Sequence, residues 1–263
     1  MDLSQVSRTA IFTLICRVIG TENDSFAFKD PMAALCLERL MTSASEEDQR
    51  WINRVKRIYE RLETRDTQAS VRRVKTFDET ANRFIADNPG CTVINLACGL
   101  DTRYWRLEHE KCSYIEIDLP EVVKLKKELL KEHLAYEILG GSVLDTAWID
   151  KVMVQGNTGF LLLAEGLFMY LPPQEASKLL QEISERFYGS QLVLDMAFRK
   201  YTKGMWKYFI QLQGKITLGL DLSMTFGIER SQDIEVYGKG FKVIGEGKGT
   251  IGPLIIASIN AIR

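Results

Sequence analysis

The pattern of hydrophobic residues changes at Gly90, and this change constrains the fold more than any other feature of the chain. After Gly90, short apolar runs alternate with helical segments, an order typical of βαβ units that build a parallel sheet. We predict buried strands over 91–96, 113–117, 160–164 and 191–196, and a helix over 174–187 with apolar residues along one face. The expected fold class is therefore α/β, with a Rossmann-like core and a mostly parallel sheet.

Both ends of the chain depart from this alternation. Residues 1–90 carry helical periods and almost no strand signal, and Asp30 is placed to cap a helix that begins at Pro31. We interpret this part as an N-terminal helical lid, with helices near 46–63 and 67–87. Residues 91–263 then form the core, which ends in an antiparallel hairpin of strands 241–245 and 254–259. Within it, residues 197–235 are rich in aromatic residues and Met, and we interpret them as a substrate-lid insertion.

Charge and composition limit the classes of partner. Of 263 residues, 46% are hydrophobic, and 34 basic residues nearly balance 35 acidic ones. No global field would attract nucleic acid or an anionic membrane, so we expect neither partner, and either one would need a local patch. The five cysteines form no CxxC pair and there are only two histidines, so we expect no metal site. No signal peptide or bilayer-spanning run is evident, which favours a cytoplasmic protein.

A glycine turn and an acid point to an adenosine-containing ligand. The strand over 91–96 runs into a tight turn at Gly99, followed by a helix, and Asp118 ends the next strand. In doubly wound sheets such a turn lies beside the ligand, and an acid in that position binds ribose hydroxyls. The alternative is that a lone glycine after a strand is merely a turn.

The missing glycines discriminate between adenosine ligands. A GxGxxG fingerprint would place glycines at 97, 99 and 102, but the chain has Ala97, Gly99 and Thr102. A pyrophosphate cradle, and with it a dehydrogenase, is therefore disfavoured. S-adenosylmethionine has no phosphates and demands less of the loop backbone.

Three ordered motifs carry a more specific resemblance. They are VINLACGLDTR at 93–103, EIDLPEV at 116–122 and AEGLFMYL at 164–171. Together with segments at 29–33 and 73–78, they resemble the leucine carboxyl methyltransferase family over roughly residues 25–195. The size of the chain is similar to that of the bacterial branch, which contains a polyketide O-methyltransferase. The resemblance implies a class I methyltransferase fold and S-adenosylmethionine as cofactor.

The resemblance also implies roles for individual residues. Arg73 would cross from the helical lid to hold the methionine carboxylate of the cofactor, a task suited to a planar, permanently charged fork. Gly99 would pass beneath the cofactor, Asp118 would bind the ribose, and Glu165 would reach its amino-acid end. As alternatives, Arg73 belongs to a solvated basic face with Arg72, and Glu165 caps the helix that follows.

Two positions depart from the family pattern. Ala97 stands where glycine is common, which tightens the loop without blocking it. Beside the adenine, Ser142 and Val143 replace the usual Asp-Leu pair, so Ser142 keeps a hydrogen-bonding group but loses the charge.

Methyl transfer from a sulfonium needs mainly a well-placed oxygen and the exclusion of water. We therefore expect an O-methyltransferase for a carboxylate or phenol of a small molecule, and we assign no catalytic base. The alternatives are a protein C-terminal carboxyl methyltransferase and a catalytically silent adenosyl-binding module. A pocket for an acidic substrate could be lined by Met169, Tyr170, Arg199, Tyr201 and Trp206, although ordinary core packing explains each of them as well.

Overall fold

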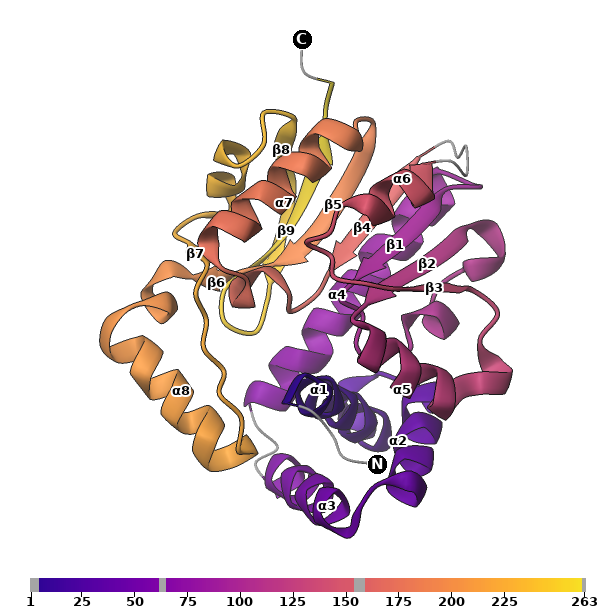
Figure 1. Ribbon diagram of the computed structural model, residues 1–263, viewed down its shortest axis with the longest axis vertical. Coiled ribbons are helices and arrows are strands. Elements are labelled where there is room, and N and C mark those ends of the chain that lie inside the picture. The colour runs from indigo at the N-terminus through magenta and orange to yellow at the C-terminus, as the bar shows by residue number, and fades with distance from the viewer. Residues whose placement is uncertain (1–4, 62–64, 154–158, 262–263) are drawn as a thin grey trace.

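A seven-stranded sheet forms the centre of the computed structural model, which describes residues 5–61, 65–153 and 159–261 (Figure 1). The strand order is β3-β2-β1-β4-β5-β9-β8; β1 to β5 are parallel, and β8 and β9 pair antiparallel. The strands are β1 (Thr92–Leu96), β2 (Ser113–Asp118), β3 (Glu137–Gly140), β4 (Phe160–Ala164), β5 (Ser190–Asp195), β8 (Phe241–Lys248) and β9 (Pro253–Ile259). The predicted fold class, including the terminal hairpin, is confirmed. The hydrophobic pattern does not reveal β3, because only Ile138 among its four residues is buried.

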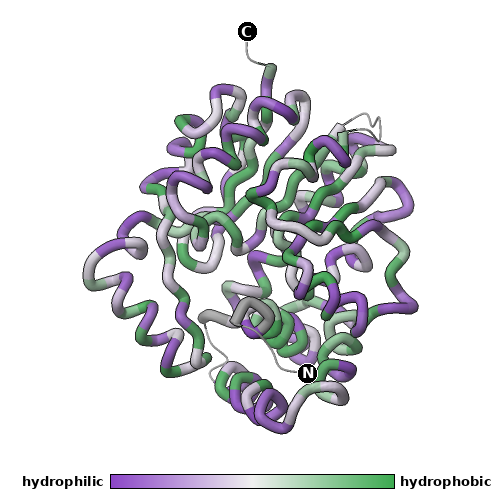
Figure 2. The backbone as a smooth tube through the Cα atoms, in the orientation of Figure 1, coloured by the Kyte–Doolittle hydropathy of each residue, from purple (hydrophilic) through white to green (hydrophobic). Residues whose placement is uncertain are grey.

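Helices cover both faces of the sheet because its strands alternate their side chains. On β1, Ile94 and Leu96 point into a core shared with α6 and α7, whereas Val93 points into a second core shared with α4. Figure 1 shows α6 and α7 in front of the sheet, and Figure 2 shows hydrophobic residues concentrated in the central strands. The bounds of the helices are α1 (Gln5–Glu22), α2 (Pro31–Ser43), α3 (Glu46–Arg61), α4 (Arg65–Asp87), α5 (Pro120–Leu130), α6 (Ala147–Met153), α7 (Pro173–Arg186) and α8 (Gly204–Leu218).

The helix expected after the glycine turn is reduced to one 3-10 turn, Arg103–Arg106. Its place on the sheet is taken by α4, whose Phe77, Ala81 and Phe84 pack against the β1 side chain Val93. A long helix from the N-terminal part therefore does the packing that a helix between β1 and β2 would otherwise do.

The N-terminal helices lie at the edge of the sheet where the parallel strands end (Figure 1). Asp30 caps α2 as predicted, because its side chain accepts a hydrogen bond from the Ala33 amide at 3.0 Å. Side chains of α1, α2 and α3 form one core with Leu100 of the glycine turn and with α5. None of the described helices combines the length and hydrophobicity needed to cross a bilayer.

The insertion after β5 has structure of its own. It contains β6 (Ala197–Phe198), α8 and β7 (Gly227–Ile228), and β6 and β7 pair in parallel as a two-stranded sheet. Elsewhere and within the insertion, the described residues also form short 3-10 turns, at Asp24–Phe26, His109–Lys111, Lys131–His133, Phe168–Tyr170, Arg199–Thr202 and Ser231–Val236. Helix α8 lies at the outer edge of the molecule, on the left in Figure 1.

Candidate functional site

The loop after β1 bends back on itself through two residues with positive φ, Ala97 at 52° and Gly99 at 56°. Three of its amides are already used within the protein. The Cys98 amide donates to the Ile117 carbonyl at 3.4 Å, the Asp101 amide donates to the Cys98 carbonyl at 2.9 Å, and the Gly99 amide donates to Asp118 at 2.6 Å. These amides are not free to cradle a pyrophosphate, which agrees with the missing glycines of the fingerprint.

Asp118 ends β2 and lies beside the glycine turn because β1 and β2 are parallel neighbours. Its two carboxylate oxygens accept hydrogen bonds from the amides of Gly99 at 2.6 Å and Leu119 at 2.7 Å. The side chain is nearly buried, and burial raises the pKa of this carboxyl group although the two amides oppose the shift. The acid and the glycine turn therefore lie side by side at adjacent strand ends, as the sequence pattern predicted.

Arg73 is buried at the carboxyl ends of β4 and β5, while its neighbour Arg72 is exposed. Its Nε donates to Glu165 Oε1 at 2.9 Å, and its Nη1 donates to Asp195 Oδ2 at 3.0 Å. Arg73 is therefore not part of a solvated basic face. The Glu165 carboxylate bonds to Arg73 and to Arg103, so it does not serve as a helix cap.

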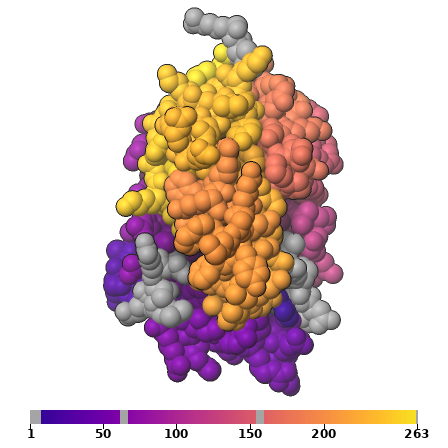
Figure 3. Space-filling view, turned by 90° about the vertical axis from the view of Figure 1, so that its left-hand side faces the viewer, coloured from indigo at the N-terminus to yellow at the C-terminus, as the bar shows by residue number. Residues whose placement is uncertain are grey.

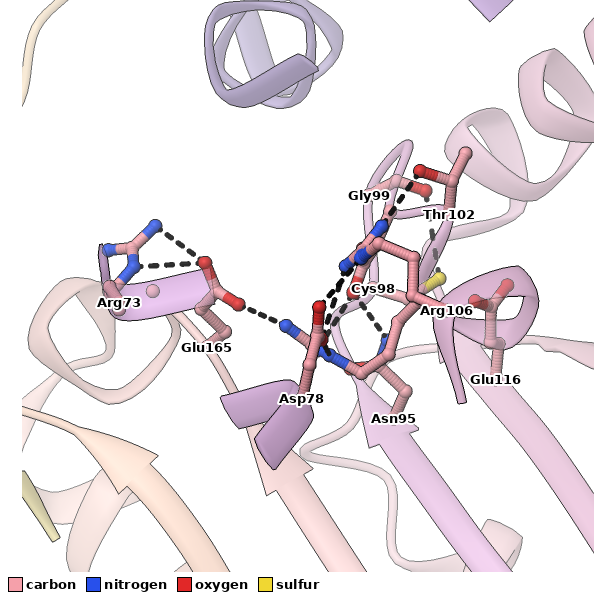
Figure 4. A network of polar contacts seen from close by, with 12 residues as sticks. Arg73, Asp78, Asn95, Cys98, Gly99, Thr102, Arg106, Glu116 and Glu165 are labelled. Carbon is pink, nitrogen blue, oxygen red and sulfur yellow. Dashed lines mark hydrogen bonds and ion pairs between the residues drawn. The ribbon is translucent and has the colours of Figure 1, made fainter. Parts of the chain in front are cut away.

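Arg103 extends this cluster toward the glycine turn. It is fully buried and contacts three carboxylates: Asp78 at 2.7 Å, Asp101 at 2.8 Å and Glu165 at 2.5 Å. Arg106 continues the network to Asp30, Asp78 and Asp101. Figure 4 shows Arg73 and Glu165 at one end of the network and the loop with Gly99 at the other. The network joins helix α4 and the start of α2 to the edge of the sheet.

The balance between burial and the arginines sets the charge of each acid. Burial opposes the ionisation of Glu165, but Arg73 and Arg103 more than compensate, so the pKa of Glu165 lies below its usual value. The pKa of Asp101 is lowered in the same way by Arg103 and Arg106. For Asp195, burial outweighs Arg73 and the Gly166 amide, and the pKa is raised.

The sequence predicted only Arg73 and Glu165 of this network as site residues. The members that were not predicted to lie there are Asp30, expected only as a helix cap, and Asp78, Asp101, Arg103, Arg106 and Asp195. Asp195 has a usable signal, since it lies near the end of the strand predicted over 191–196 and such ends meet at one edge of the sheet. Arg103 closes the motif at 93–103. Asp78 likewise closes the segment at 73–78, but only the packing of α4 brings it to the site.

Ser142 and Val143 follow β3 and lie next to β2 in the sheet, since Gly140 pairs with Asp118. Ser142 is half-buried, and its hydroxyl accepts a hydrogen bond from the Leu144 amide at 3.2 Å. The Val143 side chain is buried in the core, while its carbonyl accepts a hydrogen bond from the Trp148 indole at 3.0 Å.

The five candidate substrate residues do not all line one groove, although the ring centroids of Tyr201 and Trp206 lie 6.2 Å apart. Tyr170 comes soon after Glu165 and is 38% exposed, and Met169 is buried in a small cluster against which Tyr201 packs. Arg199 and Trp206 instead line an open groove of about 530 Å³ at the start of α8. The chain's two histidines also lie elsewhere: His109 packs on Tyr104, and His133 is half-buried beside Glu132. In the residues that the structure describes, no group of three or more His, Cys, Asp or Glu side chains could hold a metal ion.

Comparison with known proteins agrees with this geometry. The family model for leucine carboxyl methyltransferase matches residues 10–184. The tetracenomycin polyketide synthesis O-methyltransferase TcmP of Streptomyces glaucescens is 31% identical over 150 residues, which cover 54% of this chain and 55% of that protein. The chain is thus aligned with only about half of the length of that relative. The S-adenosyl-L-methionine-dependent methyltransferase dpfgK of Gibberella zeae is 24% identical over 251 residues, covering 92% of this chain and 82% of that one.

Solved structures share the fold at low sequence identity. Magnesium protoporphyrin IX methyltransferase (ChlM) of Synechocystis with bound SAH superposes with a TM-score of 0.51 at 18% identity, covering 80% of this chain and 94% of that one. An O-methyltransferase family protein of Burkholderia thailandensis gives a TM-score of 0.50 at 15% identity, covering 78% and 63%.

Proposed function

Because the chain belongs to the leucine carboxyl methyltransferase family, we propose that it is an S-adenosylmethionine-dependent O-methyltransferase. Its acceptor is a carboxylate or phenolic oxygen of a small molecule, for example a polyketide-type metabolite. The observation that carries the proposal is the pairing of the Gly99 amide with Asp118 at 2.6 Å, at the ends of β1 and β2. This pairing positions a carboxylate that could bind ribose hydroxyls next to a turn whose amides are not free to bind a phosphate group.

The residues of this edge fit the parts of the cofactor. Asp118 keeps lone pairs for ribose hydroxyls, Ser142 and Val143 lie next to it for the adenine, and Arg73 and Glu165 match the amino-acid end. Arg73 already bonds to Glu165 and Asp195, and these bonds fix the orientation of its guanidinium group. Its remaining donor capacity would hold the carboxylate of the cofactor.

The cofactor supplies a methyl group on a positively charged sulfur, and the protein holds the acceptor oxygen in line with it while excluding water. Helices α1, α2 and α3 lie over the carboxyl edge of the strands, and we propose that residues 1–90 act as the lid that excludes water. Residues 91–263 then serve as the cofactor-binding core, with the insertion at 197–235 forming part of the acceptor side.

The absence of a histidine at this edge favours an acceptor that is ionised without help. A carboxylate with a pKa near 4 is ionised at neutral pH, whereas a phenol near 10 would gain from a base. Although Tyr170 is 38% exposed, desolvation of its phenol group raises its pKa, and Asp195 is engaged by Arg73, so neither is a free base. A carboxylate acceptor is therefore the more favourable of the two.

Calorimetric titration tests the cofactor assignment. Binding of S-adenosylhomocysteine with no binding of NAD is expected, and the reverse result would overturn the proposal.

Methyl transfer from labelled S-adenosylmethionine can then be measured with small carboxylic acids, phenols and peptides that end in leucine. If the acceptor is a carboxylate, the rate of methyl transfer should stay constant between about pH 6 and 9. If it is a phenol, the rate should rise with pH. Transfer only to the peptides supports a protein carboxyl methyltransferase, and cofactor binding without any transfer supports a silent module.

A further inference from the structure

Helix α8 turns its apolar stripe toward solvent. Its residues Met205, Tyr208, Phe209, Leu212 and Ile216 follow the helical spacing i, i+3, i+4, i+7 and i+11, and each is at least 41% exposed. Among the eleven exposed large hydrophobic side chains in the described part of the chain, six lie on this helix, since Trp206 is also exposed. Such a concentration on one helix differs from hydrophobic residues scattered singly over a surface and marks an interaction site.

The outward orientation is held by contacts on the opposite side of α8. Gly214 and Leu218 are buried, and the Trp51 indole of α3 donates a hydrogen bond to the Leu218 carbonyl at 2.6 Å. A Cβ at Gly214 would lie only 3.0 Å from the Leu220 carbonyl oxygen, so this side is closely packed. Figure 3 shows α8 (orange) at the surface, near the middle of one side of the molecule.

Basic residues predominate around the stripe, although the acids Glu229 and Asp221 lie beside it. Residues 197–218 include no acidic residue and five basic ones: Arg199, Lys200, Lys203, Lys207 and Lys215. The chain as a whole carries a net charge of −1. Two of the basic groups pair with acids outside the segment, Arg199 with Glu229 at 3.6 Å and Lys215 with Asp221 at 3.8 Å. Lys200 and Lys203 line the open groove beside Trp206.

We propose that α8 docks the protein on an anionic lipid bilayer, with the apolar stripe in the boundary region and the lysines at the headgroups. Exposed aromatic and aliphatic side chains flanked by lysines are what a helix lying in the plane of a membrane needs. A second copy of the chain fits less well, because a two-fold contact would bring equal lysines together while the nearby acids Glu229 and Asp221 already pair with Arg199 and Lys215. The near-neutral chain thus carries a local patch that could bind an anionic surface.

Co-sedimentation of the full chain with lipid vesicles tests this proposal. We expect binding to vesicles of phosphatidylcholine with about one third phosphatidylglycerol, and about tenfold weaker binding to phosphatidylcholine alone. Tryptophan fluorescence should shift to shorter wavelength on binding through Trp206, which is exposed, whereas Trp51 and Trp148 are buried and Trp105 is half-buried. Raising the salt concentration from about 0.1 to 0.5 M should weaken binding.

Matched variants separate the stripe from general surface effects. Phe209→Glu should lower vesicle binding about tenfold, whereas Ile244→Glu, at a similarly exposed position on β8, should leave it unchanged. Lys203→Glu with Lys207→Glu should also lower binding, and Lys178→Glu on α7 should have little effect. Thermal melting checks that each variant is folded.

Three results would overturn the proposal. The first is the absence of wild-type binding to either kind of vesicle, and the second is equal binding by wild type and Phe209→Glu. The third is a dimer in sedimentation equilibrium that Phe209→Glu dissociates while vesicle binding is absent, which would assign the stripe to self-association. Cofactor binding is measured separately, so failure here leaves the proposed methyl transfer intact.

Discussion

Arg73 and Glu165 lie 92 residues apart in the sequence, yet two guanidinium nitrogens of Arg73 are each 2.9 Å from one carboxylate oxygen of Glu165. The other oxygen of Glu165 bonds to Arg103 at 2.5 Å. One carboxylate at the end of β4 therefore links the long helix α4 to the turn that follows β1. Loss of either arginine would leave a buried negative charge without its full compensation.

Arg103→Met should strongly destabilise the protein, because three carboxylates would lose a fully buried cation. We expect a loss of about 3 to 5 kcal/mol in the free energy of unfolding, which corresponds to a Tm lower by about 10 °C. Arg186→Met is the matched control. Because the ion pair of Arg186 with Asp150 is exposed, its loss should lower the free energy of unfolding by less than about 1 kcal/mol. Thermal melting of both variants measures the difference, and equal Tm values would show that the buried network contributes no net stability.

Lowering the pH should reduce the free energy of unfolding through Glu165 and Asp101, because the pKa values of both are lowered in the folded protein. A lowered pKa contributes stability that is fully present above the unfolded value near 4 and is lost as pH falls toward the folded value. Tm measured from pH 7 to 3 should therefore fall mainly below about pH 5. Glu165→Gln should show a smaller fall over that window, and an unchanged slope would contradict this assignment.

Asp118→Ala should weaken binding of S-adenosylhomocysteine by about 1 to 3 kcal/mol, the cost of losing hydrogen bonds between a charged acceptor and a buried partner. Calorimetry measures the effect. An unchanged affinity would mean that the acid only supports the Gly99 turn, and thermal melting would then show the loss instead.

Arg73→Lys keeps the charge but loses the fork that bonds to Glu165 and Asp195. We expect cofactor affinity to fall about tenfold or more. Arg72→Lys on the exposed side of α4 should change nothing measurable. Calorimetry and melting on both variants test the pair; similar affinities for the two would show that Arg73 holds the lid without touching the cofactor.

Gly99→Ala should destabilise the folded protein for two reasons. The backbone φ of 56° is unfavourable for alanine, and the added Cβ would lie only 3.1 Å from the Cβ of Ala10 on α1. Gly90→Ala is the control for the first alone, since its φ is 84° and nothing lies within 4 Å of the added Cβ. We expect Gly99→Ala to be the more destabilising by about 1 kcal/mol and to weaken cofactor binding. If denaturant unfolding gives equal losses for both variants, α1 does not press on the turn.

The sequence by itself determined the parts of the molecule that depend on local order. Short, continuous apolar runs specify β1, β4 and β5, which are buried on both faces. Asp30 begins α2 at Pro31, and the spacing between Gly99 and Asp118 places a turn and an acid on adjacent strand ends. Each of these follows from residues that are neighbours in the chain or in one βαβ unit.

Only the tertiary structure decided the partners of the buried charges and the direction of α8. Arg73 meets Asp195 across 122 residues and Arg103 meets Asp78 across 25, so no local spacing encodes either pair. Helical periodicity likewise groups Met205, Phe209 and Leu212 on one face, but it cannot say whether that face meets a core or solvent. The packing of Leu218 and Gly214 against the rest of the protein turns the opposite face outward.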